Sequence, residues 1–301
     1  MSKLKMKKRF SSILVCLEDF LTTRIAEGVT DKTVQSYRNM FHAIGKHIDL
    51  EMGIDELTKQ DLLQLVCSLK AKGLSENTIS GYTRHLHSFL TWANEEELTD
   101  VNIKVYKTVE TVKETYNDEE LRKLLRKPNM RTVKFFDYRN WVIINLLVNS
   151  GCRASTIRNI LIVDVDLDKG LITYRHNKNR KIQIVPLCDE MRRILRDYMR
   201  IRDGADNDFL FPSEQNKQMT ERGFQQAVAR YNKSRGVSKT SVHLFRHTFA
   251  ERFLLAGGNA FTLQRILGHS TLDMTKRYCR IYDNNIVENF NQYSPLSQLN
   301  K

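Results

Sequence analysis

Two tyrosines, Tyr278 and Tyr282, lie four residues apart in the segment LGHSTLDMTKRYCRIY, and a tyrosine hydroxyl can serve as a nucleophile. On a helix, residues four apart share a face. Tyr278 is also in phase with Met274 and Ile281, so the simplest structural explanation is an apolar stripe that packs into a core. The other polar residues of the chain decide between these two roles.

Five basic or imidazole side chains lie next to turns and helix ends, where functional groups concentrate. Arg153 follows a glycine that ends a helix, Lys178 lies at the tip of a basic turn, and His269 follows a second glycine. His243 and Arg246 are three residues apart at the start of a helix and therefore share a face. Taken singly, each has an ordinary structural explanation, such as a surface ion pair, a solvated turn or a buried histidine.

In chain order these residues form the pattern Arg…Lys…His-x-x-Arg…Gly-His…Tyr, which resembles the tyrosine recombinase (phage integrase) family. The matching stretches are SGCR (150–153), NKNRKIQIVPL (177–187), HLFRHTFA (243–250) and LGHSTLDMTKRY (267–278). The nine-residue spacing from His269 to Tyr278 is the family's spacing, whereas Tyr282 has no matching position. The resemblance implies that Tyr278 is the nucleophile of an active site completed by Arg153, Lys178, His243, Arg246 and His269.

The chemistry of phosphodiester cleavage fits these residue types. Attack on the phosphorus builds a second negative charge, and the guanidiniums of Arg153 and Arg246 stay charged and can bind the non-bridging oxygens. A tyrosine with an ordinary pKa near ~10 needs help, which nearby cations and His243 as proton acceptor would supply. The resemblance adds a covalent 3′-phosphotyrosyl intermediate, Lys178 as the acid that protonates the leaving 5′ oxygen, and His269 as a phosphate ligand.

No cofactor is expected. The sequence contains no visible carboxylate cluster for a metal ion, no P-loop and no GxGxxG motif. One position departs from the family pattern: an acidic residue commonly stands three after the first arginine, and here that residue is Thr156 in GCRASTI. The acid supports the arginine without reacting, so the departure bears on how Arg153 is braced and not on its role. It also slightly favours a mobile-element enzyme.

Composition agrees with a nucleic-acid partner. The 301 residues include 48 lysines and arginines against 35 aspartates and glutamates, a net charge of +13. Such a surplus favours a polyanion, nucleic acid first and an anionic membrane surface second. No apolar run approaches a membrane span, and the basic start is not followed by an apolar stretch of signal-peptide length, so a cytoplasmic, DNA-associated location in a bacterium is expected. Five scattered cysteines indicate reduced thiols.

The elements that must position these residues are mainly helical. Helical periodicity and capping signals predict a helical core-binding domain at 1–99, a linker at 100–116 and a catalytic domain at 117–301 with a C-terminal tail from about 284. Short β-type runs predict a small antiparallel sheet in the second domain. The expected helices and strands cover 11–27, 31–47, 58–69, 75–94, 136–150, 171–174, 181–187, 220–235, 244–256, 260–267 and 271–282. The fold expected is a two-domain clamp on duplex DNA.

Sequence recognition of DNA is expected from exposed positions on the second and fourth helices, although an ordinary solvated face explains them equally well. The candidates are Thr33, Ser36, Ser80, Arg84 and His87. In the family the tail packs into a neighbouring protomer. The apolar residues that would dock there, in trans or alternatively in cis, are Ile286, Val287 and Phe290.

These observations favour a site-specific DNA recombinase that acts as a homotetramer on two duplexes, with the integrase of a mobile genetic element as the preferred form. The first alternative is a Xer-like resolvase of chromosome or plasmid multimers. A type IB topoisomerase shares the chemistry but exchanges no partners. A DNA-binding protein with an inactive site is disfavoured because all six catalytic positions carry competent residues.

Overall fold

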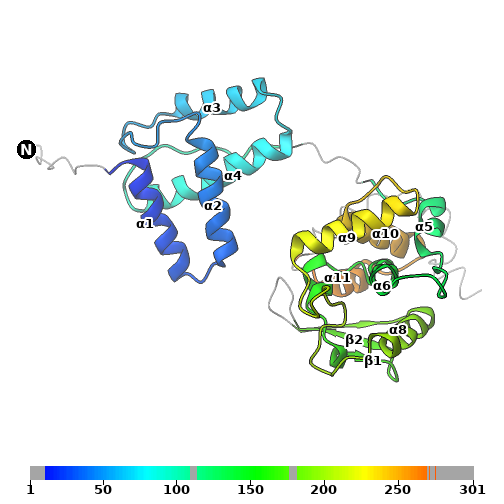
Figure 1. Cartoon of the computed structure of the whole chain (residues 1–301). Coiled ribbons are helices and arrows are strands. Elements are labelled where there is room, and N and C mark those ends of the chain that lie inside the picture. The colour runs from blue at the N-terminus through cyan, green and yellow to red at the C-terminus, as the bar shows by residue number, and fades with distance from the viewer. Residues whose placement is uncertain (1–10, 109–113, 176–181, 270, 272–274, 276–301) are drawn as a thin grey trace, which may run out of the picture. The chain divides into compact units, whose positions relative to one another are not determined.

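The computed structural model describes residues 11–108, 114–175, 182–269, 271 and 275. The chain divides into two compact units, unit 1 (Met1–Thr111) and unit 2 (Val112–Lys301) (Figure 1). Both are mainly helical, and unit 2 adds a three-stranded antiparallel sheet. The predicted fold class, a mainly helical chain with two domains and one small antiparallel sheet, is confirmed.

The described part of unit 1 contains four helices whose starts are encoded by hydroxyl side chains. Each begins after a serine or threonine whose oxygen accepts a hydrogen bond from a backbone amide of the first turn. At Thr58 the predicted capping box is complete, because Asp61 accepts from the Thr58 amide in return. The helices are α1 (Ile13–Ala26), α2 (Asp31–Ile44), α3 (Lys59–Ala71) and α4 (Glu76–Glu95).

Aromatic rings form the centre of this unit. Phe20 of α1, Phe41 of α2 and Phe89 of α4 are at most 1% exposed. Phe89 lies edge-on to both partners, with ring centroids 5.7 Å from Phe20 and 5.1 Å from Phe41. This geometry is the one that aromatic quadrupoles favour, so the three helices are held at a defined spacing around one ring.

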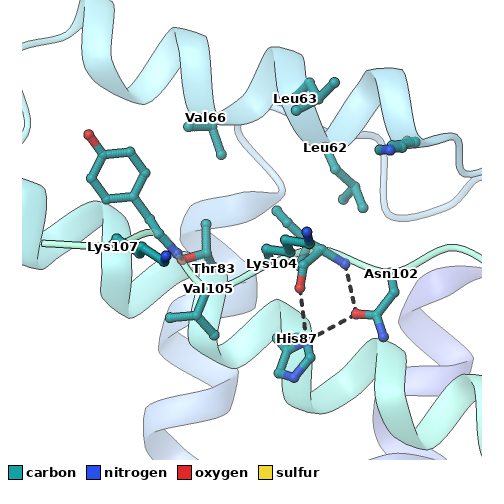
Figure 2. A pocket seen from close by; sticks show the side chains of 12 residues that line it. Leu62, Leu63, Val66, Thr83, His87, Asn102, Lys104, Val105 and Lys107 are labelled. Atoms are coloured by element: carbon teal, nitrogen blue, oxygen red, sulfur yellow. Dashed lines mark hydrogen bonds between the residues drawn. The ribbon is translucent and has the colours of Figure 1, made fainter.

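An extended segment after α4, residues 101–107, lies along α4 and is called the strap. Asn94 donates to the Val101 carbonyl at 2.8 Å, and Thr83 accepts from the Tyr106 amide at 2.9 Å. The Nδ1 atom of His87 lies 2.8 Å from the Ile103 carbonyl oxygen and 3.0 Å from the Asn102 side-chain oxygen (Figure 2). The strap thus uses one face of α4 to satisfy its backbone, and Ile103, 9% exposed, joins the core of unit 1.

Unit 2 is built around α6 (Phe135–Ser150), which is buried along most of its length. It packs against α5, α8, α9 and α10. An all-round apolar helix of this kind belongs in the middle of a core. The other helices are α5 (Asp118–Leu125), α7 (Ala154–Arg158), α8 (Asp189–Arg202), α9 (Glu221–Ser234), α10 (Val242–Leu255), α11 (Ala260–Leu267) and a short 3-10 turn, η1 (Ile162–Asp164).

The sheet has the order β1-β2-β3, formed by β1 (Val165–Asp166), β2 (Leu171–Tyr174) and β3 (Gln183–Pro186), and both pairings are antiparallel. Tyr174 pairs with Gln183, the pair of the β2–β3 hairpin that lies nearest the connecting turn. The turn that contains Lys178, and nearly all of the helix expected at 271–282, lie outside the described residues. The interval 100–116 contributes to both units, since the strap packs in unit 1 and Tyr116 is buried in unit 2.

Candidate active site

A glycine with left-handed backbone geometry brings three helices together at one point. Gly151 ends α6 with φ 57° and is buried. A Cβ atom here would lie 2.6 Å from the Phe249 side chain of α10 and 3.0 Å from the Leu267 side chain of α11. Glycine is therefore required both for the turn and for the close approach of α10 and α11. Two residues later, Arg153 forms the N-terminal boundary of α7.

Arg246 of α10 is buried at this junction, with 6% of its surface exposed. Its Nη1 atom donates to the Gly151 carbonyl at 2.9 Å, and its Nη2 atom donates to the Leu267 carbonyl at 2.8 Å. The planar guanidinium thus joins the end of α6 to the end of α11. A lysine could not reproduce that arrangement, because all its N–H donors radiate from one nitrogen and lack the planar fork of a guanidinium.

Arg153 lies at the same end of α11. Its Nη1 and Nη2 atoms lie 3.5 Å from the carbonyl oxygens of Leu267 and Gly268, at the outer limit of a hydrogen bond. Burial lowers the pKa of the Arg153 guanidinium from its ordinary value, although a guanidinium remains charged at any working pH. Two cations therefore meet at the C-terminal end of a helix, where the helix dipole is negative.

His269 lies at the same turn. α11 ends at Gly268, which has φ 63°, and the next residue presents its ring toward Thr275, with 2.9 Å between Nδ1 and Oγ1. Thr275 is fully buried. A hydrogen bond at Nδ1 fixes the orientation of an imidazole and leaves Nε2 directed elsewhere. His243 occupies the first turn of α10, three residues before Arg246, and is exposed.

Gln183 attaches the sheet to this turn. Its side-chain amide donates from β3 to the carbonyls of Arg265 and Ile266 at 2.7 Å and 2.5 Å. These carbonyls belong to the last turn of α11, where backbone acceptors lack partners within the helix. The strand that follows the Lys178 turn is thus fastened to the turn that carries His269.

The start of unit 2 braces α10 from behind. The Tyr116 amide donates to Oγ1 of Thr248 at 2.9 Å, and the Tyr116 ring lies 4.4 Å from that of Phe245, centroid to centroid. Tyr116 is 1% exposed. Arg252, one turn beyond Thr248, forms an ion pair with Asp118. One face of α10 therefore receives the incoming chain, while His243 and Arg246 occupy positions on another.

The sequence neighbours of Arg153 are structural. Cys152 is 5% exposed, and burial raises the pKa of its thiol, so a reactive thiolate is not available beside the arginine. Thr156, which stands where the family commonly has an acid, is 3% exposed. A carboxylate in this place would have to be buried, which costs free energy unless the charge is paired.

Of the six catalytic residues predicted from the sequence, the structure brings Arg153, Arg246 and His269 together and places His243 one turn from Arg246. Tyr278 and Lys178 lie outside the described residues. Sequence reasoning missed Gln183, Thr248 and Thr275, although all three lie in the stretches that carry the family pattern, because their own residue types suggest no catalytic role. Gln183 and Thr248 also act on partners that are far away in the chain.

The predicted DNA-recognition face of α4 needs a correction. Thr33 and Ser36 of α2 and Arg84 of α4 are exposed, as expected. Ser80, in contrast, is 5% exposed and faces the interior. His87 contacts the strap, so it is not available on an open surface. Helical phase identified a polar face, but the chain's own strap covers part of it.

In the described parts of the chain, no helix combines the length and the apolar content needed to cross a bilayer. In the same parts, no group of three His, Cys, Asp or Glu side chains is arranged to hold a metal ion.

Comparison with known proteins places the chain in a family. The profile of the phage integrase family matches residues 114–285, and that of the phage integrase N-terminal SAM-like domain matches residues 17–97. Tyrosine recombinase XerA of Pyrococcus furiosus is 27% identical over 277 residues, covering 90% of this chain and 91% of the relative. Tyrosine recombinase XerC of Thermodesulfovibrio yellowstonii is 25% identical, covering 91% of this chain and 94% of the relative.

Solved structures share the fold. The Tn1549 transposon integrase in complex with circular intermediate DNA aligns with TM-score 0.74 and 22% identity, over 89% of this chain and 95% of that chain. A lambda integrase tetramer bound to a Holliday junction aligns with TM-score 0.73 and 15% identity, over 90% of this chain and 78% of that chain. With the family profile covering more than half of its length, this chain belongs to the phage integrase family and is a tyrosine-type site-specific recombinase, an enzyme of DNA recombination.

Proposed function

We propose that this recombinase cuts and rejoins duplex DNA through a covalent bond between Tyr278 and a 3′ phosphate, and that it is a Xer-type enzyme that resolves multimers of a chromosome or plasmid. The observation that carries the chemistry is the meeting of Arg153, Arg246 and His269 at the end of α11. Two guanidiniums and an imidazole at one point suit a phosphate whose negative charge grows during the reaction.

In the cleavage step, the Tyr278 oxygen attacks the phosphorus and the bond from phosphorus to the 5′ oxygen breaks. The tyrosine proton passes to His243, and Lys178 donates a proton to the departing 5′ oxygen, so the products are a 3′-phosphotyrosyl bond and a free 5′-hydroxyl. One phosphate ester bond replaces another, so the bond energy is retained in the phosphotyrosyl link. A 5′-hydroxyl from a second duplex can therefore reverse the step without ATP.

The two arginines are held differently, and the difference suggests separate roles. Arg246 is buried and bonded to two carbonyls at 2.8–2.9 Å, so it forms a fixed wall of the site. Arg153 is half-buried with contacts of 3.5 Å, so it can turn toward a phosphate at little loss. The arriving phosphate would thus find one arginine preorganised and recruit the other.

The choice between a Xer-type enzyme and a mobile-element integrase rests on the relatives. Curated relatives named XerA and XerC align over about nine-tenths of the chain at 25–27% identity, in archaeal and bacterial species. The integrase structures are less than 25% identical and support the fold alone. Thr156, the residue that tilted the sequence interpretation toward a mobile element, is buried and bears on packing. The mobile-element integrase is the second candidate.

The assembly we expect is four copies on two duplexes, as in the lambda integrase tetramer solved on a Holliday junction. Docking of the C-terminal tail through Ile286, Val287 and Phe290 stays a prediction, because these residues lie outside the described part of the chain. The surplus of 13 positive charges supports binding to duplex DNA that weakens steeply with salt.

The test is covalent trapping on a nicked duplex that the protein itself has selected from a random pool. The wild-type protein should form a protease-sensitive protein–DNA adduct, Tyr278→Phe should form none, and Tyr282→Phe should retain it. The reverse result for the two tyrosines would overturn the assignment. A plasmid with two selected sites in direct repeat then separates the classes: resolution into two circles indicates a recombinase, and relaxation alone indicates a topoisomerase.

A further inference from the structure

A hollow of about 680 Å³ lies between α3 and the strap in unit 1 (Figure 2). Its lining is mainly apolar, with Leu62, Leu63 and Val66 on α3 facing Val105 and Tyr106 of the strap. Leu63 is 51% exposed, so the hollow opens to solvent beside an uncovered leucine. Exposed apolar surface combined with a concave shape is typical of a docking site.

The rim of this groove is positively charged. Lys59, Lys104 and Lys107 line it, all three are exposed, and no carboxylate is among the lining residues. None of these lysines forms an ion pair within the described parts of the chain. An occupant should therefore combine apolar side chains with acidic ones.

The outer face of α1 has this composition. Leu14, Val15 and Ile25 are 40%, 51% and 55% exposed, and Glu18 and Asp19 are exposed on the same face. In the described part of unit 1, these three residues and Leu63 are the complete set of large apolar side chains that are exposed. All the exposed large apolar side chains there therefore belong either to the groove or to α1.

The α1 face of one copy cannot fill its own groove, because its apolar residues are exposed in the same chain that forms the groove. Glu18 is already bonded to Arg38 of α2. Of the two carboxylates on this face, Asp19 is the one that forms no ion pair within the described residues. We propose that the outer face of α1 of one copy docks in the α3–strap groove of the next copy, with Asp19 facing the lysine rim.

Such a contact is heterologous, so its repetition closes into a ring or continues as a filament. The exposed area on one helix face is small compared with the interfaces of stable dimers. The contact should therefore form only where DNA holds copies side by side and raises their effective concentration. The inference rests on the proposed function only in that several copies bind one DNA molecule.

Disulfide trapping tests this pairing. Val15→Cys and Leu63→Cys are combined in a protein whose exposed Cys67 and Cys188 are replaced by serine. Mild oxidation on a duplex carrying two selected sites should give covalently linked copies, and little linkage without DNA. The matched control pairs Val15→Cys with Met130→Cys, which has similar exposure but lies in unit 2. Absence of linkage while several copies remain on the DNA, or equal linkage in the control, overturns the proposal.

Charge reversal provides a second measurement that needs no new thiols. Asp19→Lys should weaken the cooperative loading of a second copy by about 3- to 10-fold, because a like charge then faces the rim. Lys104→Glu should restore loading when combined with Asp19→Lys, whereas Lys46→Glu, at an exposed lysine away from the groove, should not. If Lys104→Glu weakens binding of the first copy and rescues nothing, the lysines contact DNA and the proposal fails. Adduct formation by Tyr278 in the same samples reports separately on the proposed function.

Discussion

Thr248 joins the start of unit 2 to α10, the helix that carries His243 and Arg246, and its hydroxyl should matter more than its methyl group. The hydroxyl donates to the Leu244 carbonyl at 2.8 Å and accepts from the Tyr116 amide at 2.9 Å, and the residue is 1% exposed. Thr248→Val keeps the shape but leaves the Tyr116 amide buried without an acceptor. Leaving a buried donor unpaired costs about 1–3 kcal/mol.

The expected loss for Thr248→Val is in the lower half of that range, because valine also avoids burying a hydroxyl. For a unit of this size each kcal/mol lowers Tm by about 2–4 °C. Thr248→Ser retains both hydrogen bonds and removes one methyl group, which costs about 1 kcal/mol. Thermal unfolding by calorimetry and amide hydrogen exchange at Tyr116 measure the two effects.

The Tyr116 amide should exchange faster in Thr248→Val than in Thr248→Ser, and the valine variant should unfold at the lower temperature. If serine destabilises the protein more than valine and the Tyr116 amide stays protected in the valine variant, the methyl group and not the hydrogen bond holds the segment. That outcome would refute the reasoning about α10.

Three further predictions concern the site and its support. Arg246→Lys should slow adduct formation by about 100-fold or more, since one preorganised donor to a developing charge contributes this much, while DNA affinity in a gel-shift assay changes little. Gln183→Ala should lower the free energy of unfolding, measured by denaturant titration, by about 1 kcal/mol through the lost hydrogen bonds to the Arg265 and Ile266 carbonyls. Gln183→Glu should lower it further, because a carboxylate, which only accepts hydrogen bonds, then faces two carbonyl oxygens. Burial raises the pKa of Tyr231 to about 12, so the folded state binds the phenol proton more tightly than the unfolded state does. The contribution of Tyr231 to the free energy of unfolding should be fully present below the unfolded pKa near ~10 and be lost as the pH rises from there to about 12. Unfolding measured against pH should show a smaller loss in Tyr231→Phe.

Short local signals in the sequence mark the residues that the structure brings together at the end of α11. Gly151 ends α6 just before Arg153, the HxxR spacing puts His243 and Arg246 on one helix, and Gly268 ends α11 just before His269. Such signals are local, and they coincide in space because Arg246 of α10 bonds to the end of α6 at Gly151 and to the end of α11 at Leu267. The roles of Tyr278 and Lys178 stay predictions.

Long-range contacts were not predictable in the same way. Ser80 and His87 were placed on an exposed face by helical phase, which reports the direction of a side chain but not what covers it. The strap looked like a linker because it has neither helical phase nor a strand partner. Gln183 and Thr248 act on residues that are 82 and 132 positions away, and nothing in their local sequence announces this.

The anchoring of both ends of the interval between the units has a consequence for chimaeric recombinases. The strap is fastened to α4 as far as Tyr106, and Lys239 of unit 2 pairs with Glu114 at 3.2 Å and with Glu120 at 3.0 Å. An exchange point after residue 99 would therefore replace a strap without its helix, and one after Tyr116 would replace a brace without α10. A junction between Lys107 and Glu114 keeps the strap with α4 and Tyr116 with α10, so it is the place to graft a foreign N-terminal unit.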